Sequence, residues 1–269
     1  MLTQRLLVSI ILIPVGLTLI AIGGWPFYLL IIFFLGVAAY EYCGLFKVGG
    51  FAPATWLVTG GVILMAVSRA VYGMAGISMV LAFLTLAAMA YHLWQYEKGR
   101  DLAATDLVVS LGGILYLGFI GSYMISLRMI EQGKWWFLVA LPAVWFADAG
   151  AFFVGRLIGK HRMAPRLSPK KSWEGYFSGI VWGIFLTAAL AGLWNMVSPG
   201  VTFWRGALVG LVISVLAPLG DLGESLLKRQ FGVKDSGNLL PGHGGALDRI
   251  DSWLWAAVIG FYLITWLWA

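Results

Sequence analysis

Residues 203–224 read FWRGALVGLVISVLAPLGDLGE, an apolar run that ends among acidic residues. Between Gly206 and Gly220 the run has no charged side chain, and its apolar positions are continuous instead of alternating. A membrane-spanning helix needs about 20 mostly apolar residues, whereas the strands of a membrane barrel alternate apolar and polar positions. The stretch therefore predicts a transmembrane helix with charged groups at one end.

Comparable runs fill most of the chain, which has 269 residues, 61% of them hydrophobic and only 11% charged. Soluble domains carry about 25% charged residues, so the composition excludes a soluble protein. The first run has a weak basic start and no small-residue cleavage pattern, which favours a retained helix over a signal peptide. We predict an all-α polytopic membrane protein with about nine spans, at residues 5–23, 25–44, 52–73, 75–95, 103–127, 135–158, 176–197, 203–224 and 252–269.

Basic residues are distributed unevenly between the loops of this topology. Of the 18 Lys and Arg residues, fourteen fall on the side of the N-terminus and only Arg69, Arg128, Lys134 and Arg205 on the other. Cytoplasmic loops carry an excess of Lys and Arg, so the N-terminus is expected in the cytoplasm and the C-terminus outside. Loops 159–175 and 225–251 then share the cytoplasmic side. The formal charge of +6 reflects this asymmetry and does not indicate nucleic-acid binding.

We expect one membrane domain over residues 1–269. Residues 1–130 supply N-terminal helices for scaffolding or lipid access, and 135–269 supply the catalytic part with the two cytoplasmic loops. The single cysteine, Cys43, excludes an intramolecular disulfide. Glycines inside the predicted spans are assigned to close helix packing, notably Gly112, Gly113, Gly206 and Gly210.

Residues 221–251, DLGESLLKRQFGVKDSGNLLPGHGGALDRID, concentrate the charge of the chain. Asp221, Glu224, Ser225 and Lys228 have the spacing of one helix face. Paired charges at a helix end would explain this pattern, but carboxylates beside an apolar run are usually functional. A hard cation such as Mg²⁺ prefers oxygen ligands, so Asp221 is a metal candidate.

The rest of this segment suits phosphate groups. Glycines in its turn permit a backbone anion nest, and His243 is equally consistent with a structural role. Asp251 is explained by capping of the last helix, so Asp248, directly after the turn, is the better second metal ligand. A second cation is left open. The basic side chains are assigned to phosphates, and the site residues of the segment are Asp221, Glu224, Ser225, Lys228, Arg229, Lys234, Asp235, His243, Gly244, Gly245, Asp248 and Arg249.

Loop 159–175 carries five Lys or Arg residues within 160–171. Binding to anionic lipid heads would explain the charge, but not the pattern Ser168-Pro-Lys170-Lys171-Ser172. We predict that Ser168, Lys170, Lys171 and Ser172 close the phosphate site and that Ser172 caps the next helix. Asp148, inside the sixth predicted span, needs a partner, and both Arg156 and the metal are candidates.

The polar segment from Ser225 to Asp251 resembles the signature of the phosphatidate cytidylyltransferase (CDP-diacylglycerol synthase) family, and Ser168–Gly175 resembles the family's second motif. The resemblance is specific over about 145–255, with Ala246 standing where a larger apolar residue is expected. It implies that CTP and phosphatidic acid give CDP-diacylglycerol and pyrophosphate, and that Asp221 and Asp248 bind Mg²⁺.

The partners implied are CTP, phosphatidic acid and the lipid bilayer, without nucleic acid, and a homodimer is left open. The expected location is a bacterial inner membrane, with the active site facing the cytoplasm. A CTP-dependent polyprenol kinase is the alternative enzyme. A transporter is disfavoured because no internal repeat is found. Neither a Walker A motif nor the pattern of CDP-alcohol phosphotransferases is present.

Overall fold

The computed structural model describes residues 13–237 and 244–268. Within them, eight helical stretches are long and apolar enough to cross a membrane, which confirms the predicted all-helical polytopic fold. The predicted span 5–23 begins outside the described residues, and its described part is a shorter apolar helix, Ile13–Ile22. The eight stretches are Gly24–Val48 (α2), Thr55–Tyr72 (α3), Ala75–Glu97 (α4), Ala103–Met129, Gly133–Ile158 (α7), Trp173–Trp194 (α8), Phe203–Gln230 and Leu247–Trp268 (α11).

Two of these stretches are not the single regular helices that the sequence predicts. Ala103–Met129 consists of α5 (Ala103–Gly113), a π-helical segment (Ile114–Ile120) and α6 (Tyr123–Met129). Phe203–Gln230 divides into α9 (Phe203–Leu216) and α10 (Pro218–Gln230). Proline has no backbone N–H and clashes with the preceding turn, so Pro218 starts a new helix. Helix α10 then continues past residue 224, the predicted end of the span.

Residue contacts divide the chain into two compact units. The first comprises Met1–Ser126 and Leu227–Ile250, and the second comprises Leu127–Leu226 and Asp251–Ala269. The sequence predicts that all of 225–251 belongs with the C-terminal helices. By contacts, Leu227–Ile250 instead groups with the N-terminal helices.

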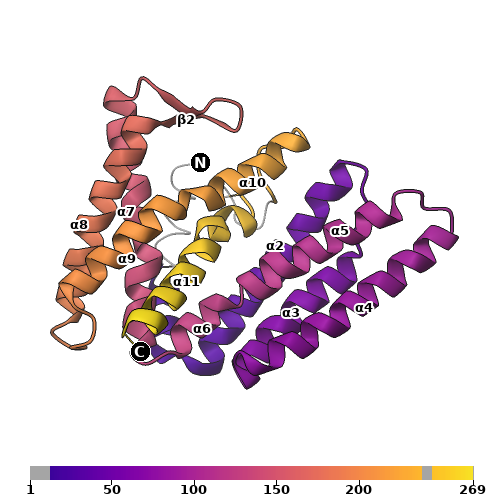
Figure 1. Ribbon diagram of the computed structural model, residues 1–269, viewed down its shortest axis with the longest axis horizontal. Coiled ribbons are helices and arrows are strands. Elements are labelled where there is room, and N and C mark those ends of the chain that lie inside the picture. The colour runs from indigo at the N-terminus through magenta and orange to yellow at the C-terminus, as the bar shows by residue number, and fades with distance from the viewer. Residues whose placement is uncertain (1–12, 238–243, 269) are drawn as a thin grey trace. The chain divides into compact units, whose positions relative to one another are not determined.

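Helices α2, α3, α4 and α5 of the first unit lie side by side (Figure 1), and α3 packs against α2, α4 and the π-helical segment. Val58, Val62 and Leu117 are fully buried in this core. A Cβ at Gly113 would lie 2.8 Å from the ring of Tyr42, as its predicted packing role requires. Phe231, which follows α10, packs edge-on against Phe46 of α2 with ring centroids 5.0 Å apart. This aromatic contact fixes part of Leu227–Ile250 to α2.

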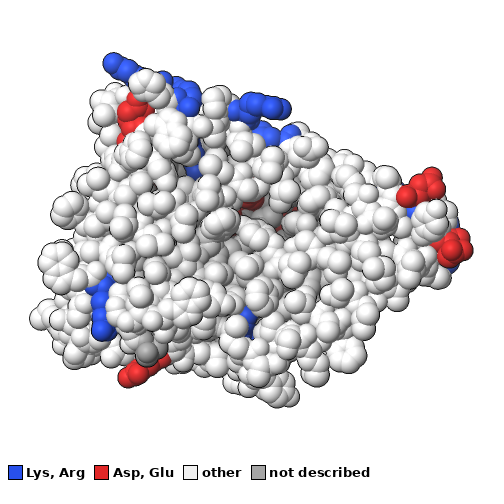
Figure 2. Space-filling view, in the orientation of Figure 1, with Lys and Arg blue, Asp and Glu red and all other residues white. Residues whose placement is uncertain are grey.

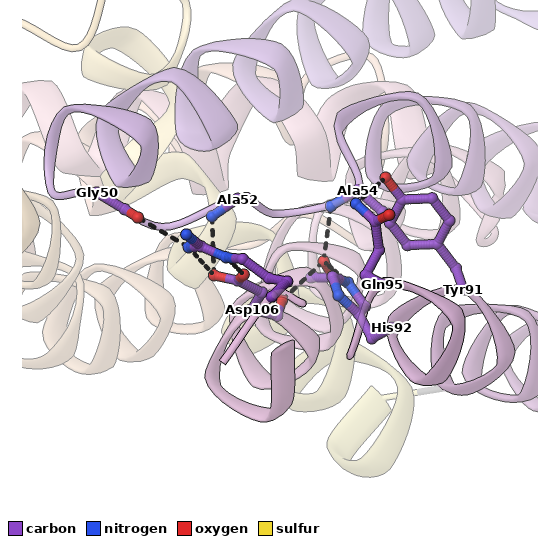
Figure 3. Close-up of polar contacts among 9 residues, drawn as sticks. Gly50, Ala52, Ala54, Tyr91, His92, Gln95 and Asp106 are labelled. Carbon is purple, nitrogen blue, oxygen red and sulfur yellow. Dashed lines mark hydrogen bonds and ion pairs between the residues drawn. The ribbon is translucent and has the colours of Figure 1, made fainter. Parts of the chain in front are cut away.

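A buried carboxylate holds the connection between α2 and α3 in the same unit (Figure 3). Asp106 is fully buried and accepts hydrogen bonds from Ala52 N at 2.8 Å and Arg100 Nε at 2.7 Å. Arg100 also donates to the carbonyl of Gly50 at 2.8 Å. Satisfying a buried charge in this way avoids its large desolvation cost. Asp106 therefore orders the turn that follows α2.

In the second unit α8 packs against α7 and α9. Small residues allow the helices to approach closely, since a Cβ at Gly179 would lie 2.7 Å from the Ala147 carbonyl and one at Gly210 2.6 Å from the Gly183 carbonyl. A Cβ at Gly206 would overlap Ala191, so the packing role predicted for Gly206 and Gly210 is confirmed. Between α7 and α8 the chain forms an antiparallel hairpin of β1 (Arg162–Ala164) and β2 (Ser168–Ser172), where the sequence predicts only a loop.

Candidate functional site

A basic cavity of about 620 Å³ opens in the second unit among α7, the β1–β2 hairpin, α8 and α9. Its apolar wall is formed by residues such as Ala151, Phe152 and Pro218. Figure 2 shows Lys and Arg side chains gathered over the hairpin. Arginine and lysine bind phosphate by charge-assisted hydrogen bonds, so the cavity suits an anionic group attached to an apolar body. The charged and hydroxyl side chains that line it include Asp148, Arg156, Arg162, Lys170, Lys171 and Ser172.

The hairpin and the start of α8 position these basic residues. Ser172 is the N-cap of α8, and its hydroxyl accepts a hydrogen bond from Gly175 N at 3.2 Å, so the predicted capping role is confirmed. Glu174, in the first turn of α8, accepts a bond from His161 Nδ1 at 2.6 Å and ties the hairpin base to the helix. Lys170 and Lys171 lie on β2 directly before this cap. The pairing of β2 with β1 and the Ser172 cap of α8 therefore fix the backbone of Lys170 and Lys171.

A carboxylate cluster lies where α10 and α11 meet in the second unit. One oxygen atom from each of Asp221, Glu224 and Asp251 lies within 4.8 Å of the others, a spacing that one metal ion can span. Gly220 makes this approach possible, because a Cβ there would lie 2.6 Å from the carbonyl of Asp251. Three carboxylates form a hard oxygen donor set of the kind that Mg²⁺ prefers. The cluster therefore fits a divalent cation.

Lys171 links this cluster to the basic cavity. Its ammonium group forms an ion pair with Asp221, and it also lines the cavity. Lys171 and Asp221 both act electrostatically on Asp148 of α7. Of the two partners that the sequence offered for Asp148, Arg156 lines the same cavity, and Lys171 connects that cavity to Asp221, a predicted metal ligand.

Asp248 is the centre of a second polar cluster, in the first unit. One oxygen accepts from Lys228 Nζ at 2.6 Å, and the other from Ser236 N at 2.9 Å, Ser236 Oγ at 2.8 Å and Gly245 N at 2.9 Å. The side chains of Lys228 and Asp248 are only 14% and 7% exposed. Such a dense set of donors holds the carboxylate in one orientation. A cation at Asp248 would replace Lys228 or share its oxygen.

The family resemblance of the sequence predicts Asp221 and Asp248 as a pair of metal ligands. The structure brings Asp221 together with Glu224 and Asp251, and it surrounds Asp248 with hydrogen-bond donors. The expectation that Asp251 is a cap is wrong, because α11 already begins at Leu247. The missed signal was the spacing on α11: Asp248 and Asp251 are three residues apart and so lie on one helix face, as the sequence already indicates for Asp221 and Glu224 on α10.

The other predicted site residues are placed as follows. Ser168 begins β2 opposite Ala164, and Ser225 is half-buried on α10. Gly244 has φ +82°, a conformation that favours glycine. His243 lies outside the described residues. The side chains that extend into solvent are Arg229, Lys234, Asp235 and Arg249.

Comparison with known proteins matches residues 3–267 to the model of the cytidylyltransferase family. The chain belongs to this family. It is 32% identical to the phosphatidate cytidylyltransferase of Bacillus subtilis, with 97% of each chain covered. It is 35% identical to that of Brucella melitensis, with 96% of this chain and 91% of the relative covered. The corresponding protein of Synechocystis is 32% identical over 97% of this chain and 96% of its own length. The similarity to this family therefore extends beyond the two polar motifs to nearly the whole chain.

Proposed function

We propose that the protein transfers the cytidylyl group of CTP to phosphatidic acid and releases pyrophosphate. An oxygen of the lipid phosphate attacks the α-phosphorus of CTP, the bond from that phosphorus to the β-phosphate bridge breaks, and CDP-diacylglycerol forms. The attacking phosphate is already an anion, so the barrier consists mainly of charge repulsion and alignment. The observation that carries the proposal is a basic, apolar-walled cavity joined through Lys171 to a carboxylate cluster.

Residues of the second unit have separate roles in this reaction. Lys170, Lys171, Arg156 and Arg162 hold phosphate oxygens within the cavity and reduce repulsion between the two anions. The apolar wall of α7 and α8 receives the glycerol and acyl end of the lipid. Tyr176 stiffens this wall, because its hydroxyl donates to the Val215 carbonyl at 2.9 Å.

We propose Mg²⁺ as the metal and Asp221, Glu224 and Asp251 as the residues that hold it. When bound, the ion neutralises phosphate charge and polarises the bonds of the triphosphate. Lys171 forms an ion pair with Asp221, so it is placed to contact a phosphate oxygen beside the ion. Asp148 lines the same cavity as Lys171.

The distribution of basic residues supports a cytoplasmic site in the inner membrane of a bacterium, where CTP is available. A single cysteine placed after Ala269, in a Cys43→Ala background, tests this topology. An impermeant maleimide should label it from outside the cell. Labelling only after the cells are opened would contradict the orientation.

The reaction is tested with purified protein in nanodiscs that contain phosphatidic acid and Mg²⁺. With CTP labelled at the α-phosphorus, label should enter the lipid, and with γ-labelled CTP it should appear only in pyrophosphate. Transfer of γ-label to lipid with release of CDP would establish a lipid kinase instead.

Comparing Lys171→Met with Arg205→Met distinguishes a role of Lys171 in the site from a general effect of removing one positive charge. Arg205 donates to the Gly200 carbonyl outside the cavity, so only Lys171→Met should lower kcat/KM.

A further inference from the structure

Glu41 of α2 is an acidic residue outside the two polar segments of the sequence. It lies in an apolar stretch, and only 7% of it is exposed. A buried carboxylate is costly unless it is hydrogen-bonded, so its contacts indicate what it is for. All the partners described for it come from the polar segment that follows α10, about 200 residues away in the chain.

Glu41 binds the start of α11. Its two oxygens accept hydrogen bonds from Ala246 N at 3.0 Å and Leu247 N at 2.9 Å. The first backbone N–H groups of a helix have no acceptor within the helix, and they carry the positive end of its dipole. A carboxylate on α2 therefore replaces the local N-cap that α11 would otherwise need.

Two glycines of the polar segment lie directly against the Glu41 carboxylate. A Cβ at Gly237 would overlap Glu41 Oε1, and a Cβ at Gly245 would overlap Glu41 Oε2 and Ser236 Oγ. Gly237 and Gly245 thus allow the backbone to close over a side chain from another part of the chain. The polar segment is folded onto Glu41 from both sides.

The same contacts reach Asp248. The Ser236 hydroxyl lies 3.2 Å from Glu41 Oε2 and 2.8 Å from Asp248 Oδ2, between the two carboxylates. Gly245 N donates to Asp248, and the next two N–H groups donate to Glu41. The orientation of Asp248 toward Lys228 therefore depends on a turn whose other anchor is Glu41.

We propose that Glu41 is a positioning residue for cytidylyl transfer: it fixes the turn formed by Ser236, Gly245 and the start of α11, and so holds Asp248 against Lys228, the lysine that the sequence assigns to substrate phosphate. The inference rests on the proposed function. It gives the N-terminal helices a specific role in the reaction in addition to packing.

The test compares Glu41→Gln with Asp106→Asn in nanodiscs. Both carboxylates are buried in the first unit and accept backbone N–H groups. The hydrogen bonds described for the Asp106 carboxylate come from Ala52, in the turn after α2, and from Arg100 (Figure 3), and none of them comes from the polar segment that follows α10. The amide of glutamine can present only one acceptor oxygen to donors that now meet two, and it carries no charge. We expect Glu41→Gln to lower kcat on the order of 10- to 100-fold, with KM for CTP changed much less. Asp106→Asn should keep the wild-type kcat for the folded protein.

Hydrogen exchange supplies a readout that does not depend on turnover. Amides 245–248 should lose protection in Glu41→Gln and keep it in Asp106→Asn. Glu41→Asp retains the charge on a shorter arm, so it should recover part of kcat and of the protection. If Glu41→Gln does not fold, Glu41→Asp decides, and it must still lower kcat several-fold without loss of thermal stability.

A kcat in Glu41→Gln within about twofold of wild type would overturn the proposal, as would equal losses of kcat in Glu41→Gln and Asp106→Asn at equal thermal stability. Failure of the proposed function is a different result, because wild-type protein itself would then transfer no cytidylyl group. The exchange comparison still tests the positioning of the turn in that case.

Discussion

Replacing Asp251 by asparagine should change stability in opposite directions with and without a divalent cation. One oxygen from each of Asp221, Glu224 and Asp251 lies within 4.8 Å of the others, and two unit charges at that distance repel by about 3.5 kcal/mol at an effective dielectric constant of about 20. Asp221 is 39% exposed and paired with Lys171, so solvent and this lysine reduce the repulsion. Removing the charge of Asp251 should therefore stabilise the metal-free protein by about 1–2 kcal/mol.

With Mg²⁺ the order should reverse. A ligand at 100 times its Kd stabilises the folded state by about 2.7 kcal/mol, and asparagine is a poorer ligand than aspartate. Thermal unfolding in EDTA and in Mg²⁺ measures both effects, with Tm changing by about 2–4 °C per kcal/mol. Glu131→Gln, an exposed carboxylate of the second unit, is the control that should respond like wild type.

The reasoning is refuted if Asp251→Asn shows the same Mg²⁺-dependent increase in Tm as wild type. A lower Tm in EDTA would contradict the repulsion argument alone. Asp248→Asn belongs in the same experiment, since the sequence assigned the metal to Asp221 and Asp248. Loss of the Mg²⁺ response in that variant would place Asp248 in the ligand set.

Three further predictions use thermal unfolding and turnover. Lys228→Met should destabilise by about 2–3 kcal/mol, because it leaves the 7% exposed Asp248 without its ammonium partner but with three other donors. A double-mutant cycle with Asp248→Asn that gives no coupling would contradict this. Ser172→Ala should cost about 1 kcal/mol through loss of the α8 cap, and an unchanged Tm would show that the cap contributes nothing. Gly245→Ala should lower kcat because its Cβ overlaps Glu41 and Ser236, whereas a Cβ at Gly223 meets nothing within 4 Å, so Gly223→Ala should behave as wild type.

The helices of this protein were predictable because the cost of exposing backbone to lipid leaves long apolar runs only one fold. The length of an apolar run does not show where the helix that it forms is interrupted. Pro218 marks the start of α10 in the sequence, but its effect was hidden within an otherwise continuous apolar run. The π-helical segment Ile114–Ile120 has no comparable signal, since it depends on how its side chains pack against α3.

The candidate site was predictable where its residues are neighbours in the sequence. Ser172 directly precedes its helix, and Lys170 and Lys171 directly precede Ser172, so their joint position followed from the order of residues. Glu41 and Asp251 were not predictable as site residues, because their partners depend on the register of one helix against another segment. A carboxylate in an apolar stretch is itself a signal of function, and Glu41, within the predicted span 25–44, is such a carboxylate.

The phosphate-binding lysines Lys170 and Lys171 lie on strand β2, whereas the described carboxylates of the candidate site and Lys228 lie at helix ends. Glu174, Asp221 and Asp248 each occupy the first turn of a helix, where the dipole favours negative charge, and Lys228 occupies the last turn of α10, where it favours positive charge. A helix end offers less freedom than a loop, so the catalytic groups lose less entropy when substrates bind. The cost is that each helix must be held in register from outside, as Gly220 does for α10 against Asp251 and as Glu41 does for α11. Substitutions that shift these registers should therefore lower kcat even though they touch no substrate.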